Sequence, residues 1–98
     1  KILGIFSDLS CYQSLNERHQ PWVDGGMFAM SIIYALHSKG IGSCCLNWAQ
    51  DDKVDMKLKE KLNIDKSYII VMFIAIGYLP EKLQVAYSKR KETSKIII

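Results

Sequence analysis

The sequence has few cysteines, histidines and prolines, and it lacks any long apolar run. It contains three cysteines, two histidines and two prolines in 98 residues. Its apolar stretches are far shorter than the roughly 20 residues of a membrane-spanning helix, so we expect no membrane partner. An odd number of cysteines, two of them adjacent, is a poor basis for internal disulfides and favours a reducing, cytoplasmic location. Neither CxxC nor HxxxH spacing occurs, so we expect no metal site.

The first residues also lack the features of a signal peptide. Lys1 to Phe6 enter strand-like sequence directly, with no initiator methionine and no small-residue cleavage site. A chain of 98 residues forms at most one domain. We therefore expect residues 1–98 to be a single unit cut from a longer chain.

The apolar pattern predicts the order strand, helix, short strand, helix, long strand. The expected elements are a strand over 2–7, a helix over 22–37, a short strand over 43–46, a second helix capped by Asp51 or Asp52, and a long strand over 68–76. The long strand is a continuous β-branched and aromatic run, which is typical of a central strand covered on both faces. This order favours an α+β or α/β sandwich.

The stretch 28–36, FAMSIIYAL, has no polar face when it is placed on a helix. Only Ser31 interrupts its apolar surface. A helix that is apolar nearly all round must be buried nearly all round. One more helix and a few strands cannot enclose it, so we expect part of its cover to come from missing sequence, a second subunit, or both.

The second predicted helix has an ordinary amphipathic pattern. Val54, Leu58 and Leu62 recur at four-residue spacing, while lysines and Glu60 occupy most of the remaining surface. This spacing predicts that the three apolar side chains pack on the core and that the opposite face is solvated.

The glycine-bracketed segment from Gly40 to Trp48 is a candidate ligand site. Glycines permit close approach of the backbone, so N–H groups at the end of the short strand could face a planar ligand. The alternative is a tight connection from helix to strand, in which Cys44 and Cys45 are small buried apolar residues.

A basic arm follows the long strand. Residues 82–95 hold five basic residues against one glutamate, a net charge of +4. Within it, Ser88-Lys-Arg-Lys91 suits a phosphate, because a guanidinium fork matches two oxygens while a hydroxyl and ammonium groups add donors. The alternative is a solvated charge run. We expect no nucleic acid partner, since no aromatic row is interleaved with the charges.

Taken in order, several motifs resemble the C-terminal half of a nitroreductase-family flavoprotein. They are Trp22-Val-Asp-Gly-Gly-Met-Phe-Ala-Met, Tyr34-Ala-Leu-His-Ser-Lys-Gly-Ile-Gly-Ser-Cys, Cys45-Leu-Asn, Phe73-Ile-Ala-Ile-Gly-Tyr-Leu-Pro and Ser88-Lys-Arg-Lys. The resemblance covers nearly the whole chain. It implies an α+β fold, a nitroreductase-like α/β sandwich with a central buried helix, here as a partial domain over 1–98.

The resemblance also implies a flavin enzyme. FMN would lie at the interface of an intertwined homodimer whose core contains the long helix. NAD(P)H would be the reductant, and a nitro, quinone or enone-like compound the acceptor. The segment Cys45, Leu46 and Asn47 would run along the isoalloxazine ring with a backbone N–H near N5. Arg90 would bind the FMN phosphate, helped by Ser88 or Lys89, and no catalytic side chain would be compulsory.

The N-terminal half of the family pattern is absent, which leaves other readings open. The partner of this chain is either a second copy or that missing half. One alternative function is a non-catalytic dimerisation or ligand-binding module that keeps the fold without flavin. Another is a thiol-redox protein that uses Cys44 or Cys45, which would need accessible thiols.

Overall fold

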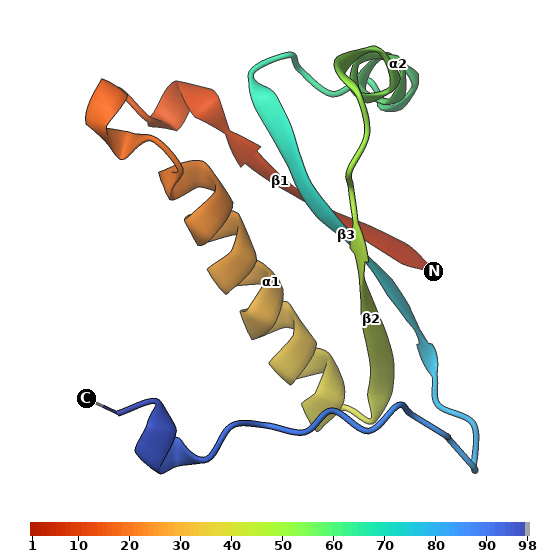
Figure 1. The fold of residues 1–98 in the computed structure, drawn as a ribbon. Helices are drawn as coiled ribbons and strands as arrows, with labels where there is room; N and C mark the ends of the chain where they lie inside the picture. Colours follow the sequence, from red (N-terminus) through yellow and green to blue (C-terminus); the bar gives the residue numbers. More distant parts are fainter. Residues whose placement is uncertain (98) are drawn as a thin grey trace.

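An antiparallel sheet of three strands forms the centre of the computed structural model, which describes residues 1–97. The elements in chain order are β1 (Ile2–Asp8), the short 3-10 helices η1 (Leu9–Cys11) and η2 (Leu15–Glu17), α1 (Gln20–Ser38), β2 (Ile41–Asn47), α2 (Asp52–Leu62), β3 (Tyr68–Tyr78) and η3 (Thr93–Lys95) (Figure 1). The predicted order is confirmed. The first helix begins two residues before the predicted position, and β2 is longer than expected at both ends.

The long apolar run occupies the middle of the sheet, as predicted. The strand order is β1-β3-β2, and β3 pairs antiparallel with both neighbours. The pairing of β1 with β3 shifts between Ile5 and Phe6, where Val71 has no opposite residue. β1 and β2 are therefore the edge strands of the described sheet.

Helix α1 packs on one face of this sheet. Ile5, Ala29 and Ile74 form the buried core between the helix and the strands. The helix approaches closely at Gly25, where an added Cβ would lie 2.6 Å from a methyl group of Val71. At the end of the helix, Gly40 has a φ of 68°, which is the left-handed conformation that glycine adopts without penalty.

Helix α2 belongs to the opposite face. Neighbouring residues on a strand point to opposite faces, so Phe73 faces away from its neighbour Ile74 and from α1. The ring of Phe73 contacts Trp48, whose indole binds Asp55 of α2. In Figure 1, α1 lies to the left of β3 and α2 lies to the right of its upper end.

The outward face of α1 is uncovered in the single chain. Met27, Phe28 and Tyr34 are 66%, 61% and 68% exposed, and Pro21, Gly25 and Ala29 are its only buried residues. The prediction that this chain alone cannot enclose the helix is confirmed. The nearly complete burial of the helix that its apolar pattern requires is not reached within one chain. No described helix is both long and apolar enough to cross a membrane.

The predicted apolar stripe of α2 is wrong in part. Leu58 is half-buried, but Val54 and Leu62 are exposed, and the buried residue of the helix is Lys59. The reason is that α2 meets the sheet through a polar contact with Trp48, which turns Asp55 and Lys59 inward. The stripe of Val54 and Leu62 therefore faces outward.

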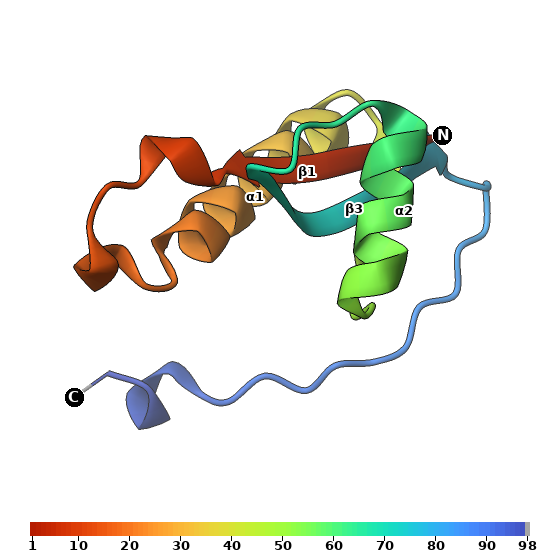
Figure 2. The ribbon, with the colours of Figure 1, turned by 90° about the horizontal axis from the view of Figure 1, so that it is seen from above.

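The segment after β3 is the exposed arm that the sequence predicts. Residues 79–97 have no strand, and their one regular element is η3. The start of the arm lies against the sheet, where Leu79, Leu83 and Val85 line a cavity together with residues of β2 and β3. The later part of the arm, drawn in dark blue, runs apart from the sheet (Figure 2). Among residues 86–97, backbone hydrogen bonds are all local, from 95–97 to Glu92 and Thr93.

Candidate functional site

The carboxyl-terminal half of β2 is an exposed strand edge. Its last three residues, Cys45, Leu46 and Asn47, are exposed. In the register with β3 they lie opposite Ile74, Phe73 and Met72, respectively. The other edge of β2 has no partner strand in the part of the chain that the structure describes. Alternate N–H and C=O groups of such an edge strand remain free for a ligand or another chain.

The alternative in which Cys44 and Cys45 are small buried residues is wrong. Both thiols are exposed and unbonded to another cysteine, as is that of Cys11. The cause is the position of β2 at the sheet edge, because neither α1 nor α2 covers its carboxyl-terminal half. Adjacent side chains on a strand point to opposite faces, so Cys44 and Cys45 do not form a pair while β2 is intact.

The basic residues predicted to bind phosphate form a local cluster on the arm. The Arg90 guanidinium donates from Nη1 to the Ser88 hydroxyl oxygen at 3.1 Å. A shallow cavity of about 290 Å³ is lined by Lys89, Arg90, Lys91, Glu92 and Lys95. The hydroxyl and the guanidinium are thus side by side, with ammonium groups around them. This donor set fits the chemistry of a phosphate.

The two predicted parts of the site do not meet within the single chain. Cys45, Leu46 and Asn47 lie on the sheet, whereas Ser88, Lys89 and Arg90 lie on the arm. The cavity at the arm cluster is lined by residues of the arm, and none of Cys45, Leu46 and Asn47 contributes to it. A ligand that contacts both groups therefore needs a different placement of the arm or the arm of another chain.

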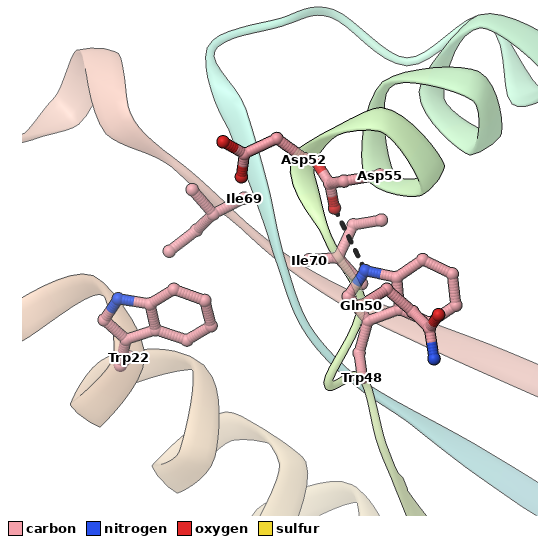
Figure 3. A pocket seen from close by; sticks show the side chains of 7 residues that line it. All are labelled: Trp22, Trp48, Gln50, Asp52, Asp55, Ile69 and Ile70. Atoms are coloured by element: carbon pink, nitrogen blue, oxygen red, sulfur yellow. Dashed lines mark hydrogen bonds between the residues drawn. The ribbon is translucent and has the colours of Figure 1, made fainter.

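A further cavity was not predicted from the sequence. It has a volume of about 190 Å³ and lies between the start of α1, the end of β2 and α2 (Figure 3). Its lining residues are Trp22, Trp48, Gln50, Asp52, Asp55, Ile69 and Ile70. The two indoles stand on different sides of the cavity, and the carboxylates come from the first turns of α2.

One side of this cavity is fixed by a polar network. The Trp48 indole donates from Nε1 to Asp55 Oδ1 at 3.0 Å, and Asp55 Oδ2 pairs with Lys59 Nζ at 2.7 Å (Figure 3 shows the first contact). The four-residue spacing of Asp55 and Lys59 could have suggested an ion pair. Nothing in the sequence linked either residue to Trp48.

The network also sets the charge of Asp55. Burial alone acts to raise the pKa of this carboxyl. The hydrogen bonds from Lys59 and Trp48 and the Lys59 charge outweigh it, so the pKa of Asp55 lies below its ordinary value of 3.8. Asp55 is therefore an ionised acceptor near neutral pH. No group of three His, Cys, Asp or Glu residues that could hold a metal occurs among residues 1–97.

Comparison with known proteins identifies a protein family that this chain matches. The Nitroreductase family matches residues 6–78. A nitroreductase family protein from Streptococcus pneumoniae TIGR4 is 28% identical with a TM-score of 0.66, and the match covers 89% of this chain and 41% of that protein. An FMN-dependent nitroreductase from Clostridium difficile R20291 is 23% identical with a TM-score of 0.70, covering 98% and 54%. No curated protein matches.

The likenesses confirm the predicted fold class, an α+β sandwich of this type as a partial domain. The chain spans about half the length of these solved relatives or less. The elements that complete the fold in those proteins are therefore not all represented in the 98 residues.

Proposed function

This chain belongs to the nitroreductase family, and we propose from that premise that it forms part of an FMN-dependent oxidoreductase. NAD(P)H is the proposed reductant, and a nitro, quinone or enone-like compound the proposed acceptor. Bound FMN would supply the redox chemistry by accepting and passing on a hydride or electrons. The single observation that supports the proposal most is the family match over residues 6–78. The donor set on the arm, which suits a phosphate, is consistent with it.

Ser88, Lys89 and Arg90 are the proposed ligands of the FMN phosphate. The contact between Arg90 Nη1 and the Ser88 hydroxyl holds the guanidinium beside a second donor before any ligand binds. The nearby ammonium groups of Lys89 and Lys91 add positive charge. Hydrogen bonds between ionised groups are roughly twice as strong as neutral ones, so this cluster can hold a dianion.

Cys45, Leu46 and Asn47 are the proposed ring-binding segment. An edge strand offers free backbone donors and acceptors at fixed spacing, and the exposed side chains of this segment leave space for a planar group. The chain's own contribution there is to orient the ring and to offer it N–H donors. We assign no acid or base to a side chain, since hydride transfer requires none.

The complete site is proposed to need a second polypeptide surface. Two observations support this: α1 leaves large apolar side chains uncovered, and the arm cluster is apart from the ring-binding segment. The proposed partner is a second copy of the chain in a homodimer, or a proposed N-terminal half of the same protein that precedes these 98 residues. The proposed location is cytoplasmic, because all three cysteines are free.

The phosphate assignment is tested with Arg90→Ala in the full-length protein. Loss of a charged hydrogen bond weakens FMN binding by about 1.5–3 kcal/mol, measured by titration of FMN and its visible absorbance. Lys82→Ala is the matched control, because Lys82 is a basic residue of the same arm outside the cluster. Equal FMN affinities of the two variants contradict the role of Arg90. A colourless wild-type protein that takes up no FMN contradicts the proposed function itself.

A second candidate function is a dimerisation or ligand-binding module that keeps the fold without flavin. The open apolar face of α1 favours it, because such a face serves assembly whether or not a cofactor binds. Under this alternative, Arg90→Ala changes solubility and leaves the assembly unchanged. A thiol-redox function has less support, since Cys44 and Cys45 point to opposite faces of β2.

A further inference from the structure

Trp48 is held at both ends. Its Nε1–H donates to Asp55 on α2 at 3.0 Å, and its ring meets Phe73 of β3 edge to face, with centroids 5.1 Å apart at 74°. Phe73 in turn contacts Phe6 of β1 at 6.3 Å and 89°. Trp48 therefore connects the end of β2 to a helix and to the centre of the sheet.

The Asp55–Lys59 ion pair is unusual as a helix contact. The two side chains are only 23% and 9% exposed, and lysine is seldom buried unless it is paired. Replacing such a pair with apolar residues is often neutral for stability, so the fold alone does not require it. What the pair does provide is orientation. Lys59 holds one carboxylate oxygen of Asp55, which leaves the other directed at the Trp48 indole.

The residue that this contact fixes is the one directly after the proposed ring-binding segment. Asn47 ends β2, and Trp48 follows it. β2 pairs with β3 alone in the described sheet, and its last four residues are exposed. An edge strand with one neighbour opens at its end unless something holds it. Leu46 also lies opposite Phe73, the residue on which the indole rests.

We propose that Trp48, Asp55 and Lys59 are positioning residues that hold Cys45, Leu46 and Asn47 in the geometry needed to receive the FMN ring. The inference rests on the proposed function for its ligand, but the network itself is a property of the chain without flavin. A pre-organised backbone binds a rigid ring better because less ordering is required at the moment of binding.

The test compares Trp48→Phe with Trp22→Phe in the full-length protein. Trp48→Phe keeps an aromatic ring for Phe73 and removes the indole donor to Asp55. Trp22 is the matched control, because it lines the same cavity while its indole has no hydrogen bond within residues 1–97. Without FMN, we expect amide hydrogen exchange over 41–48 to be about tenfold faster in Trp48→Phe than in wild type or the control, the effect of one lost hydrogen bond.

With FMN, the same variant separates positioning from general stability. We expect Trp48→Phe to weaken FMN binding about tenfold and to shift the visible absorption band of the bound flavin, whereas Trp22→Phe leaves both unchanged. Lys59→Met is the second variant, because it keeps the apolar stem and removes the ammonium that orients Asp55. It is expected to change both readouts in the same direction by a smaller amount, which keeps the test decisive if Trp48→Phe misfolds.

The outcomes separate the two proposals. Exchange and absorption bands in Trp48→Phe equal to those of Trp22→Phe overturn the positioning role. Faster exchange with an unchanged flavin band and affinity also overturns it, since the network then only stabilises β2. If the wild-type protein takes up no FMN, the proposed function fails. Faster exchange in Trp48→Phe would then show that Trp48 stabilises the end of β2, and the role of Trp48 in flavin binding would be overturned.

Discussion

The two helices contact the sheet in opposite ways. α1 approaches through its smallest residues, Gly25 and Ala29, and turns Phe28 and Tyr34 outward. α2 turns the charged residues Asp55 and Lys59 inward. In both helices some large apolar side chains, such as Tyr34 of α1 and Leu62 of α2, remain exposed in the single chain.

The difference separates two kinds of packing. Small residues let a helix and a sheet approach until their backbones are close, and a contact of that kind tolerates almost no added volume. A polar contact through long side chains holds two elements at a distance and depends on charge and orientation instead. α1 is therefore the rigid support of the sheet, and α2 is joined to it at the functional edge through Trp48.

The largest expected effect is at Gly25, where the close packing of α1 can be broken with one methyl group. In Gly25→Ala the new Cβ would lie 2.6 Å from Val71 Cγ2 and 3.1 Å from the Ser7 hydroxyl. We expect the free energy of unfolding to fall by about 1–3 kcal/mol, measured by denaturant titration. The matched control is Gly26→Ala, because the added Cβ would have no atom within 4 Å outside the neighbouring residues and backbone of its own helix. There the gain in helix propensity should raise stability by up to about 1 kcal/mol. Changes of the same sign at both positions would contradict the proposed close approach.

The contrast between the helices also marks what the sequence could predict. The apolar character of 28–36 correctly indicated a helix that one chain cannot enclose, because that conclusion needs only a count of apolar positions. The continuous run 68–76 correctly indicated the central strand for the same reason. Both predictions rest on local patterns that no tertiary contact reversed.

The failures have a common physical cause. The four-residue spacing of Val54, Leu58 and Leu62 predicted the buried face of α2. Asp55 and Lys59 have the same spacing on the adjacent face of the helix. The hydrogen bond from Trp48 to Asp55 directs that charged face toward the sheet instead. Similarly, the alternative in which Cys44 and Cys45 are buried assumed that their strand is covered. Burial depended on whether that strand was central or at the edge, which is a property of the sheet order. The roles of Cys45, Leu46, Asn47, Ser88, Lys89 and Arg90 stay predictions.

A smaller effect is expected at the charged contact of α2, and it depends on pH. The folded pKa of Asp55 is below the ordinary value of 3.8, because the hydrogen bonds and charge of its partners outweigh the effect of burial. The stabilisation is therefore present above pH 3.8 and is lost as the pH falls through the lower folded value. Asp55→Asn should lower stability at pH 7 by about 1 kcal/mol and remove this part of the acid dependence.

Denaturant titrations at a series of pH values measure this difference. Glu60→Gln is the matched control, since Glu60 is an exposed acid on the same helix. The ion pair would have no energetic role if Asp55→Asn and Glu60→Gln followed the same curve of stability against pH as wild type.

The smallest effect on the stability of the fold is expected from a substitution on the outward face of α1. Such a substitution separates the role of α1 in the fold from a role in assembly. Tyr34 is 68% exposed, so Tyr34→Ser should change the stability of the chain by no more than about 0.5 kcal/mol. If a second copy covers this face, the same substitution removes a large apolar contact from the interface and weakens the assembly, which sedimentation at several protein concentrations detects. Tyr87→Ser is the control, because Tyr87 is a tyrosine exposed on the arm. A protein that is monomeric at all concentrations before any substitution would contradict cover of this face by a second copy.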